Sequence, residues 1–361
     1  AQCLVGSEMC IRDSINSLGP SQRGLSALES QLRYISHYPD ATNDDILNAI
    51  ADIYGMNKNQ IVVGNGAAEL LYAICRLPGY TGAFVPAPGF SEYKAALEAS
   101  RIPVRDIYYR PREDEHGKPY FEVPYLALET FAAELKGQDG RIIVFLGNPN
   151  NPDGTLLDKN HIRTIASMLK DANSLLVIDE SFIDFVGNDT LQDNEYSMRS
   201  LVNEFDNIIV VHSFTKFYAV PGLRIGAAFS NPLIIEQLNS FIPTWSVNTL
   251  AQSYTEAALN DVEYVKRTKQ VLHEEQLFMH NSLDTIDGIT VYPPSANFML
   301  FHIEQEGITA ESINEALKKD NMIVRNCDSY MGLNNQWVRV AIKDHDTNVK
   351  LVEKLTDILK V

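Results

Sequence analysis

Short apolar runs alternate with helix-like segments through the middle of this 361-residue chain, and this alternation restricts the possible folds more than any other feature. The runs are rich in Val, Ile and Leu, and turns that contain Gly or Pro separate them. Continuous apolar runs of this kind are typical of strands in a parallel sheet that helices cover on both faces. We therefore predict an α/β fold, with strands at QIVV, GAFV, RIIVFL, SLLVID, NIIVVH and RIGAAF.

The end of the sequence follows a different pattern. A long helical tract runs from Asn248 to about Leu283, and the residues after it are β-rich and then helical. This pattern predicts a second, smaller α+β domain. We expect residues 38–265 to form the large domain and residues 266–361 to form the linking helix and the small domain. Residues 15–37 would be an N-terminal arm that also contributes to the small domain.

Composition excludes several classes of protein. The net charge is −17, whereas a nucleic-acid binder needs a basic face, so we expect no nucleic-acid partner. No apolar run reaches the length of a transmembrane helix, so we expect no membrane partner. The four cysteines have neither metal-ligand spacing nor the arrangement of a disulfide framework. We therefore expect a reducing, cytoplasmic compartment and no metal site.

The first residues of the chain are unusual. Met9 to Ser14, MCIRDS, match one reading frame of a common transposon sequencing adaptor, ATG TGT ATA AGA GAC AG. Our hypothesis is that residues 1 to about 14 are an artefact of this origin, that the native sequence begins near Ile15, and that Ser7–Ser14 is not a structural element. The alternative is a natural N-terminal tail.

Polar residues follow the predicted strands, at the edge where open α/β sheets bind ligands. Gly66 lies in a turn that opens a helix, and amides at a helix N-terminus can hold a phosphate. Asn151 lies in the turn NPNNPDG, and Asp179 ends an apolar strand. Each feature alone also fits an ordinary turn, loop acid or helix cap.

The stretch HSFTKFYAVPGLRIG adds a lysine and an arginine, Lys216 and Arg224, with hydroxyls at Ser213 and Thr215. Two cations this close in an apolar neighbourhood need an anion between them. Burial and a nearby positive charge also lower the pKa of a lysine, which makes it a nucleophile. Pyridoxal 5′-phosphate (PLP) requires such a set: a lysine, a carboxylate for its ring nitrogen, a donor to its phenolic oxygen, and a phosphate cradle.

At these residues the sequence resembles the fold-type I PLP enzymes of aminotransferase class I/II. The resemblance covers about residues 15–361, and its motifs in order are NPNNPDG, DESF, SFTK and GLRIG. It implies a PLP-dependent transferase fold, in which a mainly parallel seven-stranded sheet flanked by helices forms the large domain. It also implies a homodimer whose active sites draw on both subunits.

The resemblance assigns a role to each matching residue. Lys216 is similar to the Schiff-base lysine, Asp179 to the partner of the ring nitrogen, and Asn151 to the donor to the phenolic oxygen. Phe90 resembles the aromatic residue that stacks on the ring. The phosphate cup would consist of Gly66, Ala67, Ala68, Ser213, Thr215 and Arg224.

Substrate and partner contacts are implied in the same way. Arg339 matches the arginine that binds the substrate α-carboxylate, for which a bidentate guanidinium is suited. Tyr54 would reach the cofactor phosphate of the partner subunit. Arg325 and Asn16 are candidates for a substrate phosphate, and Arg325 is equally compatible with a surface position. If residues 1–14 are an artefact, Asn16 is a surviving part of an arm that closes over the substrate.

One position departs from the usual aminotransferase pattern. Phe182 stands three residues after Asp179, where these enzymes usually have a tyrosine, so one hydrogen bond to the phenolic oxygen is lost. The segments GNGAAELLY, FSEY, DESFIDF, SANFMLF and WVRVAIK resemble L-threonine-O-3-phosphate decarboxylases, of the cobalamin pathway, and Phe182 is part of that resemblance. A small phosphorylated amino acid is then the expected substrate. Histidinol-phosphate or a related aminotransferase is the alternative, and a catalytically impaired PLP-binding relative is a third possibility.

Overall fold

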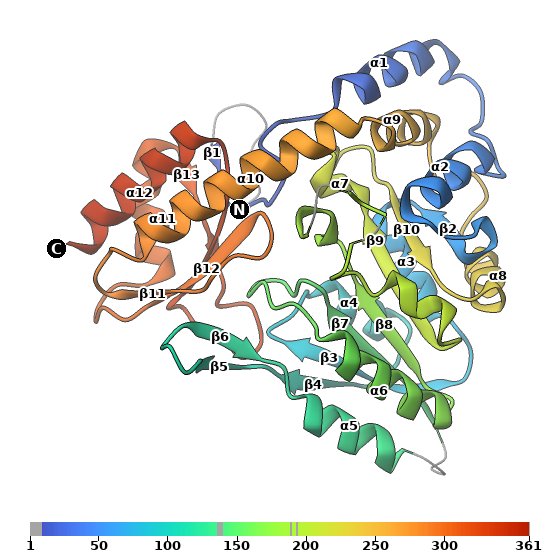
Figure 1. The fold of residues 1–361 in the computed structure, drawn as a ribbon, viewed down its shortest axis with the longest axis horizontal. Helices are drawn as coiled ribbons and strands as arrows, with labels where there is room; N and C mark the ends of the chain where they lie inside the picture. The colour runs from blue at the N-terminus through green and yellow to red at the C-terminus, as the bar shows by residue number, and fades with distance from the viewer. Residues whose placement is uncertain (1–8, 136–139, 188–189, 193, 361) are drawn as a thin grey trace.

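The computed structural model describes residues 9–135, 140–187, 190–192 and 194–360. A seven-stranded sheet forms its centre (Figure 1). All of its strands run parallel except β10, which is antiparallel to both of its neighbours. The prediction of a mainly parallel seven-stranded sheet is thereby confirmed. In spatial order the strands are β2 (Ile61–Gly64), β10 (Gly226–Phe229), β9 (Ile208–Ser213), β8 (Leu175–Asp179), β7 (Arg141–Gly147), β3 (Tyr80–Ala87) and β4 (Val104–Tyr108).

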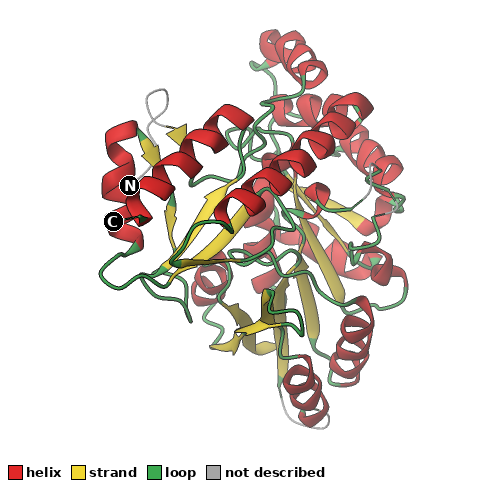
Figure 2. Ribbon diagram, turned by 60° about the vertical axis from the view of Figure 1, so that its left-hand side comes forward, coloured by secondary structure: helices red, strands yellow, loops and turns green. Residues whose placement is uncertain are grey.

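Helices cover both faces of this sheet, which Figure 2 shows from a second direction. Because successive strand residues point to opposite faces, Val177 packs into one core and Ile178 into the other. The core of Val177 is closed by α3 (Gly66–Cys75), α4 (Glu92–Ala99) and α8 (Pro232–Phe241). The core of Ile178 is covered by α6 (Lys159–Asp171). Burial on both sides explains why these strands are continuous apolar runs.

A second sheet has four antiparallel strands and forms the predicted α+β part. Its strands in spatial order are β11 (Ile289–Val291), β12 (Phe298–Ile303), β15 (Trp337–Ala341) and β14 (Arg325–Asn326). The helices α11 (Ala310–Leu317) and α12 (His345–Leu359) belong to this part of the chain.

The predicted long helical tract is in fact two helices, α9 (Thr249–Leu259) and α10 (Val262–Leu283). Asp261 separates them because its side chain accepts a hydrogen bond from the backbone N–H of Tyr264 and caps α10. Figure 1 shows α10 running from the large sheet toward the four-stranded sheet. The proposed domain boundary after residue 265 falls within α10 and stays a prediction.

No helix in the described ranges has both the length and the hydrophobicity needed to cross a membrane.

The remaining helices and strands lie outside the two sheets described above. The elements are the helices α1 (Gln22–Gln31), α2 (Asp44–Tyr54), α5 (Tyr125–Glu134) and α7 (Phe214–Phe217), the strands β1 (Met9–Cys10), β5 (Arg110–Glu113), β6 (Pro119–Glu122) and β13 (Met322–Ile323), and the 3₁₀ turns Leu32–Tyr34, Lys58–Gln60, Ile183–Phe185, Arg199–Asn203 and Lys318–Asp320.

The N-terminal segment differs from expectation in one respect. Met9 and Cys10 pair in parallel with β13, and Ile11 is buried, so the expectation that Ser7–Ser14 is not a structural element was wrong for Met9 to Ile11, while Ser7 and Glu8 lie outside the described residues. The backbone explains this, because the carbonyl of Ile11 accepts a hydrogen bond from the N–H of Ala341 at the end of β15. The helix α1 packs against α9, and the carbonyl of Ile15 accepts a hydrogen bond from Nζ of Lys343, so the assignment of residues 15–37 stays a prediction. The adaptor origin of residues 1–14 remains a hypothesis.

Candidate active site

The strand register brings the predicted site residues to one edge of the large sheet. Asp179 ends β8 opposite Gly147 of β7 and Val211 of β9. Because β10 is antiparallel, its first residue Gly226 pairs with the last residues of its neighbours, Ser213 and Gly64. The reversed strand therefore places the loop that carries Arg224 at the same edge as Lys216.

A cavity at this edge is shared by the central residues. The structure brings Lys216, Asp179, Asn151 and Phe90 into its wall, as the sequence predicted. Phe182 is also in the wall, and its ring centre is 5.3 Å from Nζ of Lys216. The cavity is lined by Phe90, Tyr93, Pro149, Asn151, Asp179, Ser181, Phe182 and Lys216.

Lys216 lies in the short helix α7, directly after β9. Its Nζ donates a hydrogen bond to Oγ of Ser213 at 3.0 Å, and Ser213 is hydrogen-bonded to Oγ1 of Thr215 at 2.8 Å. Burial lowers the pKa of Lys216 to about 8, with Asp179 opposing and Arg224 assisting this shift. Near neutral pH a larger fraction of this amine than of an ordinary lysine is therefore neutral and nucleophilic.

Asp179 is buried, with 6% of its surface exposed, and both of its oxygens are hydrogen-bonded. Oδ1 accepts from the N–H of Ser181 at 2.9 Å, and Oδ2 accepts from the hydroxyl of Tyr93 at 2.9 Å. Burial and the charge of Asp179 raise the pKa of Tyr93 well above its usual value, so the phenol stays a donor. Our sequence analysis missed Tyr93, although it lies only three residues after Phe90, in the first turn of α4.

The turn before α3 is shaped for close approach of a ligand. Gly66 has φ +79°, and a Cβ atom there would lie 2.4 Å from Nη2 of Arg224. A Cβ atom on Gly226 would lie 2.6 Å from the backbone nitrogen of Ala67. Glycine is therefore required at both positions. The result is a cradle of α3 amides, with Ala67 and Ala68 in the first turn and the Arg224 guanidinium beside Gly66.

Asn151 links the cofactor side of the cavity to Arg339. Its Oδ1 accepts hydrogen bonds from the hydroxyl of Tyr330 at 3.1 Å and from Nη1 of Arg339. Its Nδ2 group is then the donor left for a phenolic oxygen. Arg339 is buried, its Nη2 donates to the carbonyl of Arg12 at 2.9 Å, and its Nε has no hydrogen-bond partner among the described residues.

These residues fit PLP. The buried carboxylate of Asp179 suits the ring nitrogen, the amine of Lys216 suits the aldehyde, and the cradle at Gly66 suits the phosphate. The unpartnered Nε of Arg339 indicates a further ligand for this guanidinium, because buried donors are rarely left unpaired. A substrate carboxylate would supply the missing acceptor.

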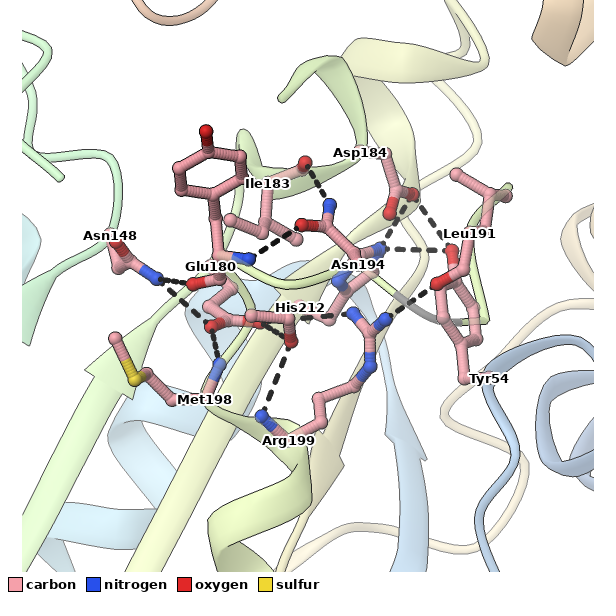
Figure 3. Close-up of polar contacts among 12 residues, drawn as sticks. Tyr54, Asn148, Glu180, Ile183, Asp184, Leu191, Asn194, Met198, Arg199 and His212 are labelled. Carbon is pink, nitrogen blue, oxygen red and sulfur yellow. Dashed lines mark hydrogen bonds and ion pairs between the residues drawn. The ribbon is translucent and has the colours of Figure 1, made fainter. Parts of the chain in front are cut away.

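Two predicted site residues lie elsewhere. Tyr54 is 3% exposed, and its hydroxyl donates to Oδ2 of Asp184 at 2.7 Å, so it cannot reach a partner subunit (Figure 3). Asn16 is also buried, and its Nδ2 contacts the carbonyl of Phe217 at 2.8 Å, the hydroxyl of Tyr264 at 3.0 Å and Oγ1 of Thr268 at 2.9 Å. We therefore correct both expectations: each side chain has a structural role within its own chain.

Arg325 lies beside the site rather than inside it. It lines a neighbouring pocket of about 480 Å³, which shares Phe90 with the first cavity. Its Nη2 donates to Oγ of Ser329 at 3.1 Å, and its guanidinium lies 5.3 Å from the ring centre of Tyr330. Tyr330 in turn contacts Asn151, which connects the pocket of Arg325 to the cofactor residues.

Comparison with known proteins gives relatives named as threonine-phosphate decarboxylases or cobalamin biosynthesis proteins, and others named as histidinol-phosphate aminotransferases. The chain is 31% identical over 352 residues to threonine-phosphate decarboxylase of Salmonella typhimurium, which covers 96% of this chain and 90% of that protein. It is 31% identical over 346 residues to a bifunctional adenosylcobalamin biosynthesis protein of Leptospira interrogans, where it spans 96% of this chain but only 38% of that protein.

Structural comparison adds an aminotransferase. The crystal structure of histidinol-phosphate aminotransferase from Clostridium acetobutylicum superposes with a TM-score of 0.86, 25% identity, and coverage of 97% of this chain and 99% of that chain. A family model, aminotransferase class I and II, matches residues 16–355. Together with the cofactor geometry, these matches identify the chain as a member of the aminotransferase class I and II family of PLP-dependent enzymes.

Proposed function

We propose that this enzyme decarboxylates L-threonine O-3-phosphate to (R)-1-aminopropan-2-yl phosphate and CO₂, a reaction of cobalamin biosynthesis. The observation that carries the proposal is the pairing of Arg325 with Arg339. These two residues are directly opposite each other on β14 and β15, so their side chains leave the same face of the sheet. Like charges in such a pair repel each other. A substrate with two anionic groups, a carboxylate and a phosphate, compensates for that repulsion.

The surroundings of the two arginines support different partners for them. Arg339 is buried beside Asn151 and suits the carboxylate next to the reacting carbon. Arg325 is only partly buried and opens onto the pocket of about 480 Å³, which also contains Ser91, Lys94 and Ser329. The pocket also contains Asp328, and Lys94 is paired with Asp106 at 2.7 Å, so Arg325 and the hydroxyls of Ser91 and Ser329 are the groups that would bind a phosphate.

In this proposal each residue of the site has a separate role in the reaction. PLP, when bound, supplies a ring that accepts the electron pair released at the substrate Cα. Asp179 would hold the ring nitrogen in its protonated form, and Asn151 would donate to the phenolic oxygen. Arg325 and Arg339 would hold the substrate by its phosphate and its carboxylate and so fix which bond at Cα is placed to break. CO₂ then leaves, and Nζ of Lys216 or a water molecule delivers a proton to Cα.

Histidinol-phosphate aminotransferase is the second candidate, favoured by the fold similarity to the Clostridium enzyme. In that reaction the Cα–H bond would stand perpendicular to the ring, and Lys216 would move its proton. Histidinol phosphate has no carboxylate, so Arg339 would act on the second substrate instead.

A product assay separates the candidates. The PLP-loaded enzyme is given L-threonine O-3-phosphate alone and, in a second reaction, histidinol phosphate with 2-oxoglutarate. CO₂ release that does not depend on an oxo acid supports the proposal, and glutamate formation supports the aminotransferase. A protein that shows the yellow absorbance of lysine-bound PLP but forms neither product contradicts both assignments.

A homodimer with shared active sites is part of the proposal. Large nonpolar side chains are exposed at Leu32, Tyr34, Ile35, Tyr38 and Trp245, with exposed fractions between 44% and 79%. The rings of Tyr38 and Trp245 stack at 4.4 Å, and Ser246 contacts Glu69 in the first turn of α3. This patch therefore adjoins the phosphate cradle. A second copy of the chain that covers the patch would complete the site from outside.

A further inference from the structure

A group of buried polar side chains lies near the ends of β8 and β9 (Figure 3). We call it the rear cluster. Each of its side chains is at most 3% exposed. Its two acids are Glu180, within the segment DESFIDF, and Asp184, four residues later in the same segment. The cluster consists of Tyr54, Glu180, Asp184, Arg199 and His212.

Two members of the rear cluster, Glu180 and His212, directly adjoin residues of the candidate site in the chain. Asp179 points to the core that contains Tyr93, and Glu180 is the next residue in the chain. Likewise, Ser213 contacts Lys216, and His212 precedes it in β9 with its ring packed on Tyr54 at 5.1 Å, in the other core. Asp179 and Ser213 thus each have a rear-cluster residue as an immediate neighbour in the chain.

One half of the cluster is built on Asp184. Its Oδ2 accepts hydrogen bonds from the Tyr54 hydroxyl at 2.7 Å and from Nε2 of His212 at 2.9 Å. Burial opposes ionisation of Asp184, but the charge of His212, their hydrogen bond and Arg199 together lower its pKa below the usual value. Asp184 is therefore ionised at neutral pH and ties β9 to α2.

The other half is built on Glu180. Its oxygens accept hydrogen bonds from Nδ2 of Asn148 at 3.1 Å, Oγ of Ser197 at 2.6 Å and the N–H of Met198 at 2.6 Å. Arg199 lies 3.7 Å from Glu180 and 4.4 Å from the centre of the Tyr54 ring, so it joins the two halves. A continuous chain of contacts therefore links Asn148 after β7, Glu180 after β8 and His212 in β9.

We propose that the rear cluster is a positioning unit for the cofactor. By holding the ends of β7, β8 and β9 together, it fixes the spacing of Asn151, Asp179 and Lys216, which follow or adjoin those ends. Buried charges are costly, and apolar residues of similar volume often support stability equally well. A role in spacing explains why charged groups are used here. The inference rests on PLP binding and holds for either proposed reaction.

The test compares variants that break the cluster with a variant that breaks a similar cluster elsewhere. Asp184→Asn and His212→Leu remove the central contact, whereas His212→Gln keeps a donor near the position of Nε2. The matched control is Glu275→Gln, since Glu275 is 8% exposed and hydrogen-bonded to His345 at 3.0 Å and Asn348 at 2.8 Å in the region of α10 and α12. The measurements are the PLP dissociation constant, the pH midpoint of the bound-PLP absorbance and the melting temperature of the apo protein.

We expect Asp184→Asn and His212→Leu to weaken PLP binding by roughly tenfold or more, because losing a residue that orients a binding group commonly has an effect of this size. Both variants should also shift the pH midpoint of the bound-PLP absorbance. His212→Gln should restore most of the affinity. Glu275→Gln should lower the melting temperature without changing either PLP measurement. Equal PLP affinity and pH midpoint in His212→Leu and His212→Gln would overturn the proposal. If Asp184→Asn does not fold, the two His212 variants and Tyr54→Phe, which removes a single hydroxyl, decide the question.

Discussion

The hydroxyl of Tyr93 donates a hydrogen bond to Oδ2 of Asp179 at 2.9 Å from within the protein core. The ring of Tyr93 is held there by stacking on Phe145, with ring centres 5.3 Å apart, and by an edge contact with Phe90. The carboxylate proposed for the cofactor nitrogen is thus oriented by Tyr93 in the first turn of α4, three residues after Phe90, which is proposed to stack on the ring.

Replacing Tyr93 with Phe should therefore destabilise the apo protein. Loss of a hydrogen bond to a buried carboxylate typically costs about 1.5–3 kcal/mol of unfolding free energy. Urea unfolding of Tyr93→Phe measures this cost. Tyr109→Phe is the control, because the hydroxyl of Tyr109 is buried without a hydrogen-bond partner in the described part of the chain. Removing the hydroxyl of Tyr109 should leave the free energy of unfolding unchanged or slightly higher. Equal losses of unfolding free energy in both variants would contradict a stabilising hydrogen bond from Tyr93 to Asp179.

The phosphate cradle makes a second prediction. In Gly226→Ala the new methyl group would meet the backbone nitrogen of Ala67 at 2.6 Å, and backbone atoms cannot move aside as a flexible side chain can. PLP affinity should fall by roughly tenfold or more, since displacement of site atoms by a fraction of an ångström impairs their hydrogen bonds. Gly222→Ala in the same loop has no atom within 4 Å of its new Cβ and should bind PLP normally. Titration of PLP absorbance compares the two variants.

The pKa of Lys216 predicts a pH-dependent difference in stability. In the folded apo protein the amine releases its proton near pH 8, whereas in the unfolded chain it keeps the proton up to its ordinary value of 10.5. Between these values the unfolded state binds more protons, so this lysine makes folding more favourable as pH rises. Lys216→Met should therefore be more stable than the wild type below pH 8, and its advantage should shrink toward pH 10.5. Urea unfolding across this range tests the sign, and a constant difference would refute it.

Arg339→Lys should weaken substrate binding. A lysine keeps the charge but loses the planar, two-point contact with a carboxylate, and it also loses the contact of Nη1 with Asn151. We expect the dissociation constant of L-threonine O-3-phosphate to rise by roughly tenfold to a hundredfold, corresponding to one hydrogen bond between charged groups. Spectral titration of the PLP-loaded variant measures it. Unchanged affinity would show that the carboxylate lies elsewhere.

The exposed nonpolar patch predicts where a dimer forms. Trp245→Lys places a charge in the patch beside Tyr38 and should shift the protein toward monomer in sedimentation velocity, since large aromatic residues often dominate interface energetics. Leu126→Lys is the control, because Leu126 is 78% exposed on α5, outside the patch. Identical sedimentation of both variants and the wild type would argue against this interface.

Much of the fold and site could be predicted because the relevant signals are local. The strands of the large sheet are apolar runs, and the polar residues after them are brought together by parallel register alone, as for Asp179 and Val211. Tyr54 and Asn16 were assigned incorrectly because their roles depend on partners 130 and 201 residues away, Asp184 and Phe217. Such contacts leave no periodic pattern in the sequence.

The features that the sequence analysis missed also depend on contacts between positions far apart in the chain. Tyr93 reads as one more apolar position of a helix until its distance to Asp179 is known. β1 was not foreseen because it is only two residues long and depends on β13, more than 300 positions later. The opposed pair of Arg325 and Arg339 became visible only when the register of β14 and β15 was known.

The contacts that hold the segment after β1 have a consequence for how freely its sequence can change. Arg339 binds the carbonyl oxygen of Arg12, and Lys343 donates to the carbonyl of Asp13 at 2.9 Å. These are main-chain groups, which every amino acid carries. Replacing the side chain at position 12 or 13 should therefore leave both hydrogen bonds in place, because the backbone supplies the two acceptors.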